Sequence, residues 1–343
     1  MEENLKTMKA WQLHAFGLEN LTLDNVDIPA PKHNEILIKV GAVSLNFRDK
    51  AIVDGIYTPD KIQFPVIPVS DTSGTVVAIG SGVNRFKIGD RVTSHLYSHW
   101  IDGKPADNEQ EFSLGSPLSG GLAEYMILEE GSTVFSPSSL NDEEASTLPI
   151  AALTPWYSMV TCGNLKTGET VVLQGTGGVS IFGLQIAHAL GAKTILTTSD
   201  DEKGQKAKDL GADEIVNYKQ TPDWATEVLN LTNGIGADQI LDIAGGEGLN
   251  DSVRAAKVGG QVSVIGFLQG QNTNLDLMNV IFKRTRVQGI AVGHLKAFEE
   301  MNKAFDKYNI KPVIEKIYSF EEAIEAYQHL AKGAFGKIVI KIS

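Results

Sequence analysis

The chain has 343 residues, of which 42% are hydrophobic, so it can bury the cores of about two domains. Its formal net charge of −12 argues against nucleic acid and anionic membranes as partners, because both bind clustered Lys and Arg. No stretch reaches the roughly 18 apolar residues that a membrane-spanning helix needs. Residues 1–7 lack the apolar core of a signal peptide, and the lone Cys162 allows no disulfide within the chain, so we expect a cytoplasmic protein.

Residues 8 to about 126 have the pattern of a β-rich domain. Strands are expected at 35–40 and 74–79, and Gly and Pro turns separate the strands of this segment. Helical periodicity is scarce there. The first third of the chain is therefore expected to fold mainly as β-structure.

From about residue 145 strands and helices alternate. Strands are expected at 170–174, 193–198, 214–217, 239–242, 260–265 and 286–291. Helices are expected between them, for example at 202–210 and 248–256. This α/β order predicts a doubly wound parallel sheet with helices on both faces. The tail is expected to add helices near 297–308 and 320–331 and a last strand at 337–342.

A glycine turn follows the first strand of this α/β segment. The strand at 170–174 leads into Gly175, Gly177 and Gly178, and a helical pattern begins at Val179. Glycines let the backbone approach a pyrophosphate closely, and the start of a helix offers unpaired N–H groups. Because the glycines lie between a strand and a helix, they predict a dinucleotide-binding turn, with an ordinary tight turn as the alternative.

Several further motifs occur in a recognisable order. They lie at 45–49, 80–92, 121–125, 153–156 and 336–340. Together with the glycine turn they resemble the medium-chain dehydrogenase/reductase superfamily, and within it the zinc-lacking quinone oxidoreductase-like branch. The resemblance implies a GroES-like β domain, split across both ends of the chain, around a Rossmann domain that binds NAD(P), with the active site in the cleft between them.

The resemblance also implies domain boundaries and an oligomeric state. We expect residues 1–126 to form the first part of the GroES-like catalytic domain and 127–297 the Rossmann domain. Residues 298–343 are expected to return to the catalytic domain. A homodimer is expected through the edge strand near 286–291.

The residues at the positions of the zinc ligands of zinc-bearing relatives indicate whether this chain binds a metal. Asn46 stands where zinc-bearing relatives have a cysteine, and Val69-Ser70-Asp71 replaces their Gly-His-Glu. An amide and a hydroxyl are poor zinc ligands, and one cysteine cannot build a four-cysteine structural site. His95 and His99 are the alternative metal-binding pair, but no third ligand lies near them in the sequence. We therefore expect no metal.

Cofactor choice depends on the residues that meet the adenosine ribose. An acidic side chain about 20 residues after the glycine turn selects NAD, since it repels a 2′-phosphate. By resemblance, Thr198 takes the place of that acid. The residues that favour NADPH over NADH are Thr198, Ser199, Lys203 and Tyr218. The alternatives are that Asp200 turns toward the ribose, or that Asp200 and Asp201 cap the next helix.

The residues near the nicotinamide come from the resemblance alone. They are Thr154, Ile265, Phe267, Ala291, Val292 and Gly293. Strand-end turn geometry is the alternative explanation of the glycines in the last two segments.

The expected chemistry is reduction of a conjugated acceptor. NADPH delivers hydride to carbon, and the acceptor oxygen then carries negative charge, which needs hydrogen-bond donors where no metal is present. Asn46 offers an amide and Tyr57 a hydroxyl, and by resemblance Tyr57 lies near the proton-donating tyrosine of mitochondrial-type enoyl reductases. Asn46 as a backbone-bonding loop residue and Tyr57 as part of a hydrophobic turn are the alternatives. Arg48 is expected to pair with Asp49, or else to bind the cofactor phosphates.

The sequence thus predicts an NADPH-dependent, zinc-independent reductase of quinones or α,β-unsaturated carbonyls. One alternative is an enoyl-thioester reductase, which usually carries a basic patch for the phosphopantetheine of its substrate. No such cluster is evident in the sequence. A second alternative is a non-catalytic NADPH-binding regulator or structural protein.

Overall fold

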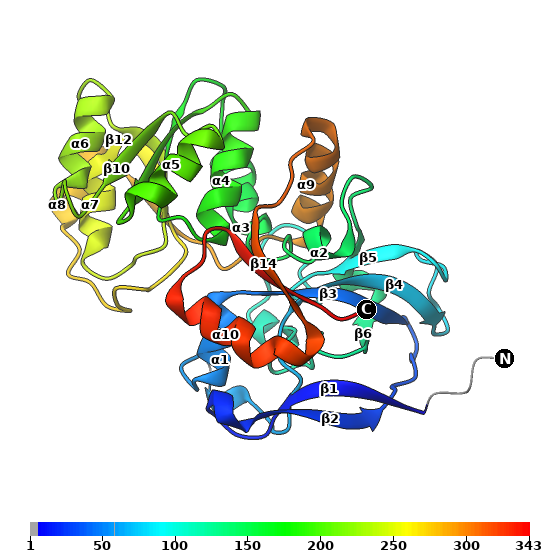
Figure 1. Ribbon diagram of the computed structural model, residues 1–343. Helices are drawn as coiled ribbons and strands as arrows, with labels where there is room; N and C mark the ends of the chain where they lie inside the picture. Colours follow the sequence, from blue (N-terminus) through cyan, green and yellow to red (C-terminus); the bar gives the residue numbers. More distant parts are fainter. Residues whose placement is uncertain (1–5, 58) are drawn as a thin grey trace. The chain divides into compact units, whose positions relative to one another are not determined.

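The computed structural model describes residues 6–57 and 59–343, which form two compact units (Figure 1). The first unit comprises the described residues up to Ala151 together with His294–Ser343. The second unit is Ala152–Gly293. The first unit is thus built from both ends of the chain, and the second unit is continuous in sequence. None of the described helices has the length and apolar character needed to cross a membrane.

A seven-stranded sheet is the framework of the first unit. Its order is β14-β15-β3-β4-β5-β7, and β6 also pairs with β3. The strands are β3 (Glu35–Leu45), β4 (Asp71–Ile79), β5 (Arg91–Ser94), β6 (Tyr125–Glu129), β7 (Thr133–Phe135), β14 (Ile314–Ser319) and β15 (Lys337–Lys341). A separate antiparallel pair consists of β1 (Thr7–Leu13) and β2 (Leu21–Asp27).

Four α-helices belong to the same unit. They are α1 (Phe47–Val53), α2 (Asp142–Ala145), α9 (Leu295–Tyr308) and α10 (Ala323–Lys332). Helix α10 packs against β15 and β3, and its Tyr327 is among the largest fully buried side chains. The core of the unit therefore joins the end of the chain to strands near its beginning.

The second unit is a six-stranded parallel sheet in the order β10-β9-β8-β11-β12-β13. Its strands are β8 (Thr170–Gln174), β9 (Lys193–Thr198), β10 (Glu214–Asn217), β11 (Ala237–Asp242), β12 (Ala256–Val264) and β13 (Arg286–Gly289). In chain order the sheet reads 3-2-1-4-5-6, the doubly wound arrangement. Ligands of such sheets bind at the carboxyl ends of the strands where the order reverses, here between β8 and β11.

Helices pack against the strands of this sheet (Figure 1). They are α4 (Gly178–Ala189), α5 (Asp201–Asp209), α6 (Trp224–Leu231), α7 (Gly248–Ala255) and α8 (Leu277–Lys283). Helix α3 (Leu153–Trp156) packs against α4 and is continued by a π-helical turn, η5 (Tyr157–Cys162). The predicted strands at 170–174, 193–198 and 214–217 have the observed bounds. The predicted strand at 260–265 starts earlier, at Ala256, and that at 286–291 ends at Gly289.

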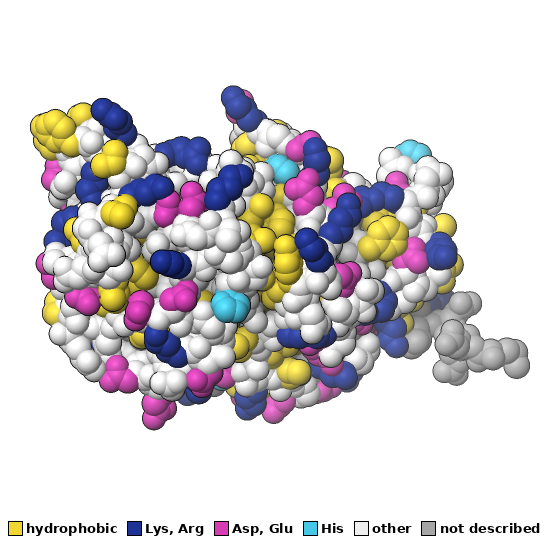
Figure 2. Space-filling model, turned by 90° about the horizontal axis from the view of Figure 1, so that it is seen from above, with side chains coloured by type: hydrophobic (Ala, Val, Ile, Leu, Met, Phe, Trp, Pro, Cys, Tyr) yellow, Lys and Arg dark blue, Asp and Glu magenta, His cyan; other side chains and the backbone are white. Residues whose placement is uncertain are grey.

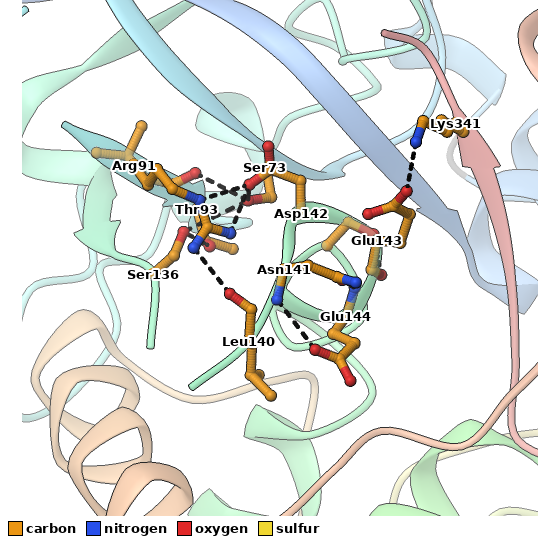
Figure 3. A network of polar contacts seen from close by, with 12 residues as sticks. Ser73, Arg91, Thr93, Ser136, Leu140, Asn141, Asp142, Glu143, Glu144 and Lys341 are labelled. Carbon is orange, nitrogen blue, oxygen red and sulfur yellow. Dashed lines mark hydrogen bonds and ion pairs between the residues drawn. The ribbon is translucent and has the colours of Figure 1, made fainter. Parts of the chain in front are cut away.

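The observed unit boundaries differ from those expected at 126/127 and 297/298. Arg91 on β5 donates from Nε and Nη2 to Asp142 Oδ1, at 3.1 and 2.7 Å, and Ser73 Oγ on β4 donates to the same atom at 3.1 Å (Figure 3). Lys341 on β15 pairs with Glu143 at 3.0 Å. These contacts bind α2 to the sheet of the first unit, so the boundary falls after Ala151.

Candidate active site

The glycine turn lies between β8 and α4, as the sequence predicts. Gly175 has φ +75°, a conformation that side chains other than glycine rarely adopt. A Cβ added to Gly177, the residue that begins α4, would meet no heavy atom within 4 Å. No side chain caps α4, so the N–H groups of its first turn lack partners within the helix. Open space beside free N–H groups fits the pyrophosphate of a dinucleotide.

Buried polar side chains tie together the ends of β8 and β11. Gln174 donates through Nε2 to Ser252 Oγ at 2.9 Å, and its Oε1 accepts from the backbone N–H groups of 243–244, each at 3.2 Å. Asp242 accepts from Ser252 Oγ at 2.6 Å and from Gly245 N at 2.8 Å. This network holds the loops at the point where the strand order reverses. We did not predict it, although Gln174 and Asp242 are polar residues that end two apolar strands.

At the end of β9, Asp200 caps α5. Its Oδ1 accepts from Lys203 N at 3.0 Å, which is the capping alternative that the sequence left open. The N–H of Asp200 donates to Thr198 Oγ1 at 3.2 Å, so the buried Thr198 hydroxyl has a partner within the turn. Asp201 does not share the cap and instead accepts from Asn217 Nδ2 at 2.5 Å. Neither carboxylate is left without a partner in the chain.

Basic and hydroxyl side chains surround this turn. The N–H of Tyr218 donates to Thr198 O at 2.9 Å, and the side chain of Tyr218 is 40% exposed. The pKa of Asp200 lies below its usual value. The main cause is the hydrogen bond from the Lys203 N–H, and the positive charges of Lys203 and Lys219 contribute less. Both lysines thus lie near Asp200. Lys219 was not predicted, although it directly follows Tyr218 at the end of β10.

Thr154, in α3, has a buried hydroxyl. The residue is 1% exposed, and its Oγ1 forms no hydrogen bond with the residues that the structure describes. The π-helical turn η5 begins three residues later, and such turns occur often at functional sites. A buried hydroxyl without a partner fits contact with a bound cofactor, because a ligand acceptor would remove the cost of leaving it unpaired.

The segments after β12 and β13 lie beside other strand ends. Ile265 N donates to Asp242 O at 2.8 Å, and a Cβ on Gly266 would collide with the carbonyl of Ile243. A Cβ on Gly293 would lie 2.7 Å from Tyr157 Cβ, next to α3. Close packing therefore accounts for both glycines. Of the other expected cofactor residues here, Phe267 is half-buried, Ala291 is exposed and Val292 is buried.

In the first unit, Asn46 is the N-cap residue that directly precedes α1. Its N–H donates to Asp49 Oδ2 at 2.7 Å, and its Oδ1 accepts from Lys337 Nζ at 2.6 Å. The Nδ2 of Asn46 is buried and makes no hydrogen bond of ordinary length and angle, although the amide lies near enough to Asp71 to lower the pKa of that carboxyl. Asn46, Asp49, Asp71 and Lys337 together form what we term the buried polar cluster.

Burial dominates the electrostatics of the buried polar cluster. It raises the pKa of Asp71, and it raises that of Asp49 to about 6. It lowers the pKa of Lys337 to about 8, against the opposing pull of the two carboxylates. Asp71 also accepts from Ser70 Oγ at 2.9 Å and from Ile150 N at 3.1 Å. The cluster was not predicted, although Lys337 opens an apolar strand, which is an unusual place for a lysine.

Arg48, in the first turn of α1, contacts Tyr57, which lies in the bend that follows the helix. The guanidinium carbon of Arg48 is 5.5 Å from the centre of the Tyr57 ring. The sequence predicts a pair between Arg48 and Asp49. The guanidinium of Arg48 instead donates to the carbonyls of Leu114 and Ser116, at 3.0 and 2.8 Å. These bonds tie α1 to the segment 113–116. Burial, reinforced by the neighbouring Tyr57, raises the pKa of Tyr97 above its usual value.

Two family models match the chain. The alcohol dehydrogenase GroES-like domain matches residues 32–138, and the zinc-binding dehydrogenase family matches residues 178–307. A zinc-type alcohol dehydrogenase-like protein of Schizosaccharomyces pombe is 35% identical, and the match covers 95% of this chain and 96% of that protein. The chain belongs to the medium-chain dehydrogenase/reductase superfamily. It is an NAD(P)H-dependent oxidoreductase.

Other relatives in this superfamily carry different names. An acryloyl-coenzyme A reductase of Sulfurisphaera tokodaii is 29% identical over 93% of this chain and 96% of that protein. A quinone oxidoreductase of Pongo abelii is 28% identical over 99% of both. A solved structure from Sinorhizobium meliloti, described as a candidate alcohol dehydrogenase, is 43% identical with a TM-score of 0.93, covering 98% of this chain and 99% of that one. The last likeness confirms the GroES-like and Rossmann folds.

Zinc does not fit the residues that stand at the ligand positions of zinc-bearing members of the superfamily. The oxygen of Asn46 faces the ammonium of Lys337, and the hydroxyl of Ser70 donates to Asp71. A divalent cation bound to Asn46 would lie against the buried ammonium and would be repelled by it. No step of the proposed reaction is therefore assigned to zinc.

The alternative histidine pair is divided between different partners. His95 is buried and contacts the carbonyl of Tyr97 through Nδ1 at 2.8 Å. His99 contacts Glu129 through Nε2 at 3.1 Å. Over residues 6–57 and 59–343, no group of three or more His, Cys, Asp and Glu side chains is placed to hold a metal ion.

Proposed function

We propose that the chain is an NADPH-dependent, zinc-independent reductase of quinones or α,β-unsaturated carbonyls. The observation that carries the proposal is the contact between Asn46 and Lys337, which puts an amide donor and an ammonium where zinc-bearing relatives have a metal ligand. Bound NADPH supplies a hydride to an electrophilic carbon. The name of the quinone oxidoreductase relative supports this substrate class.

The second unit is proposed to hold the cofactor. The glycine turn, Gly175, Gly177 and Gly178 with Val179, receives the pyrophosphate. The 2′-phosphate is bound by residues that offer hydroxyl groups or positive charge: Thr198, Ser199, Lys203, Tyr218 and Lys219. The nicotinamide lies near Thr154 and the segments 265–267 and 291–293. The free hydroxyl of Thr154 and the open side of Gly177 support this placement.

The first unit is proposed to bind the acceptor. When the acceptor carbon is reduced, negative charge develops on its oxygen, and preorganised donors stabilise that charge. Asn46 Nδ2 is the proposed donor. Because this atom is shielded from water, a substrate oxygen reaches it only after a neighbouring side chain moves. Tyr57 is the proposed second donor and proton source, since it is only half-buried and shares its surroundings with Tyr97.

An enoyl-thioester reductase is the second candidate. The name of the acryloyl-coenzyme A reductase relative favours it. A coenzyme A thioester carries phosphates that clustered Lys and Arg would bind. On the face shown in Figure 2, Lys and Arg side chains lie among Asp and Glu side chains. We therefore prefer acceptors that carry no coenzyme A.

Loss of NADPH absorbance with a panel of quinones, enones and enoyl thioesters tests this choice of substrate class. Absence of any turnover would indicate a non-catalytic NADPH-binding protein.

We also propose a homodimer that uses α8 and the edge strand β13. Helix α8 exposes four large apolar side chains, of Leu277, Met278, Ile281 and Phe282, with 63%, 56%, 61% and 71% exposure. Exposed apolar side chains gathered on one short helix are typical of an interaction surface, and an edge strand offers unpaired backbone groups. A second copy of the same chain would cover both. We also propose a cytoplasmic location, which fits a chain whose one cysteine, the half-buried Cys162, forms no disulfide within it.

Replacing Phe282 with Asp should convert the dimer to a monomer, because a charge would be buried in the interface. Ile235→Asp is the matched control, since Ile235 is 67% exposed and lies outside α8 and β13. Sedimentation equilibrium checks both variants. A monomeric unmodified protein, or a dimer that survives Phe282→Asp, would contradict this interface.

A further inference from the structure

A lysine ammonium is buried inside the first unit. Lys337 is 3% exposed, and its Nζ donates to Leu45 O at 2.7 Å and to Asn46 Oδ1 at 2.6 Å. A buried charge is costly unless it is paired and hydrogen-bonded. Asp71 and Asp49, both fully buried, supply the opposite charge. The ammonium is thus a built part of the structure, held by strands β3, β4 and β15 and helix α1.

The bond from Lys337 fixes the orientation of the Asn46 amide. Because Oδ1 already accepts from the ammonium, the N–H₂ end of the amide is the end left for another partner. That end makes no hydrogen bond of ordinary geometry within the part of the chain that the structure describes, but it lies beside the carboxylate of Asp71, whose place an acceptor oxygen would have to take. A positive charge on the carbonyl side also polarises the amide, which strengthens its N–H groups as donors.

We propose that Lys337 is a positioning residue of the reductase, which holds the Asn46 amide with its N–H₂ end available to the acceptor oxygen. This inference rests on the proposed function. It accounts for a charged cluster at a place where apolar side chains of similar volume would avoid the cost of desolvation.

A variant that loses the Lys337 ammonium together with one buried carboxylate separates a positioning role of Lys337 from a purely structural one, because the two roles predict different kcat values. Lys337→Met removes the ammonium and leaves the buried carboxylates of Asp71 and Asp49 without the positive charge that offsets them, so it lowers the melting temperature under either role. Lys337→Met combined with Asp71→Asn removes both charges and should restore much of the melting temperature. If Lys337 serves only stability, kcat recovers with it. If Lys337 positions Asn46, kcat stays low.

The test compares four variants of the full chain. We expect Lys337→Met and the double variant to have kcat at least tenfold below the unmodified protein, since misplaced catalytic groups cost up to about 100-fold. Asp71→Asn alone keeps the bond between Lys337 and Asn46 and should retain a higher kcat than the double variant. Lys341→Met is the matched control on the same strand, because Lys341 is exposed and pairs with Glu143 (Figure 3).

The NADPH dissociation constant should stay within twofold in all four, because the cofactor is bound by the second unit. Recovery of kcat in the double variant to within twofold of the unmodified protein would overturn the proposal, as would an equally low kcat in Asp71→Asn alone.

If the unmodified protein reduces no acceptor, the proposed function has failed. Crystal structures of the variants then test separately whether Lys337 orients Asn46. The inference then requires Asn46 to change its side-chain rotamer in the double variant and to keep it in Lys341→Met; an unchanged Asn46 in both refutes it.

Discussion

Asn46→Ala is expected to lower kcat by about 100-fold, which corresponds to the loss of one preorganised donor to a developing oxyanion. The NADPH dissociation constant should stay near that of the unmodified protein, because Asn46 lies in the first unit and the glycine turn in the second. Steady-state kinetics with a quinone and an enone measure the effect. The same substitution also removes the residue that begins α1, which costs about 1 kcal/mol of stability.

Asn141→Ala is the matched control for that loss of stability. Asn141 begins α2 and accepts from Glu144 N at 2.8 Å, so its removal also costs a helix cap but no proposed donor. It should lower the melting temperature without changing kcat. Equal effects of Asn46→Ala and Asn141→Ala on kcat would show that Asn46 acts only through the stability of its helix.

Tyr57→Phe completes this prediction by separating proton donation from charge stabilisation. An enolate must still receive a proton after reduction, whereas a reduced quinone can take protons from water. We therefore expect Tyr57→Phe to slow enone reduction more than quinone reduction. If Asn46→Ala and Tyr57→Phe both turn over every acceptor within twofold of the unmodified protein, neither side chain stabilises the transition state.

NADPH should bind about 5- to 150-fold more tightly than NADH, the equivalent of roughly 1–3 kcal/mol from charge-assisted hydrogen bonds to the 2′-phosphate. Oδ1 of Asp200 is engaged in capping α5. Lys203→Ala and Lys219→Ala should each reduce the preference and leave NADH binding nearly unchanged. Calorimetric titration with both cofactors measures it.

Lys208→Ala is the control for these two substitutions. Lys208 lies on the same helix as Lys203 but pairs with Glu214 at 3.7 Å, so its removal should not affect the choice of cofactor. Tighter binding of NADH than of NADPH by the unmodified protein would refute the proposed 2′-phosphate site. An unchanged preference in both alanine variants would assign that preference to other residues.

Local sequence patterns were sufficient for the central strands of the second unit. The strands at 170–174, 193–198 and 214–217 follow directly from apolar runs bounded by turns, and glycines mark the turn after the first of them. Strand β14 was missed because it is an edge strand whose side chains are mostly exposed, so it has no apolar alternation. The alternation of apolar and polar residues in a sequence reflects which side chains are buried. An exposed edge strand is held mainly by backbone hydrogen bonds, so it leaves no such alternation.

The buried polar cluster could not be predicted from local patterns. Asn46 and Lys337 are separated by 291 positions and meet only because β15 pairs with β3. The sequence did single out Asn46, through its place in a motif, but it gave no reason to connect it with Lys337 or Asp71. Arg48 shows the same limit, since its partners near residue 114 lie far from the adjacent Asp49 that the sequence favoured.

The central claim is that this chain reduces conjugated acceptors with NADPH and without zinc. The most direct measurement is turnover of NADPH with quinones and enones by protein treated with a chelator and shown by elemental analysis to be free of metal. Our account predicts that the chelated protein reduces at least one of these acceptors at the rate of the untreated protein. One tightly held zinc per chain, with loss of activity when it is removed, would contradict it.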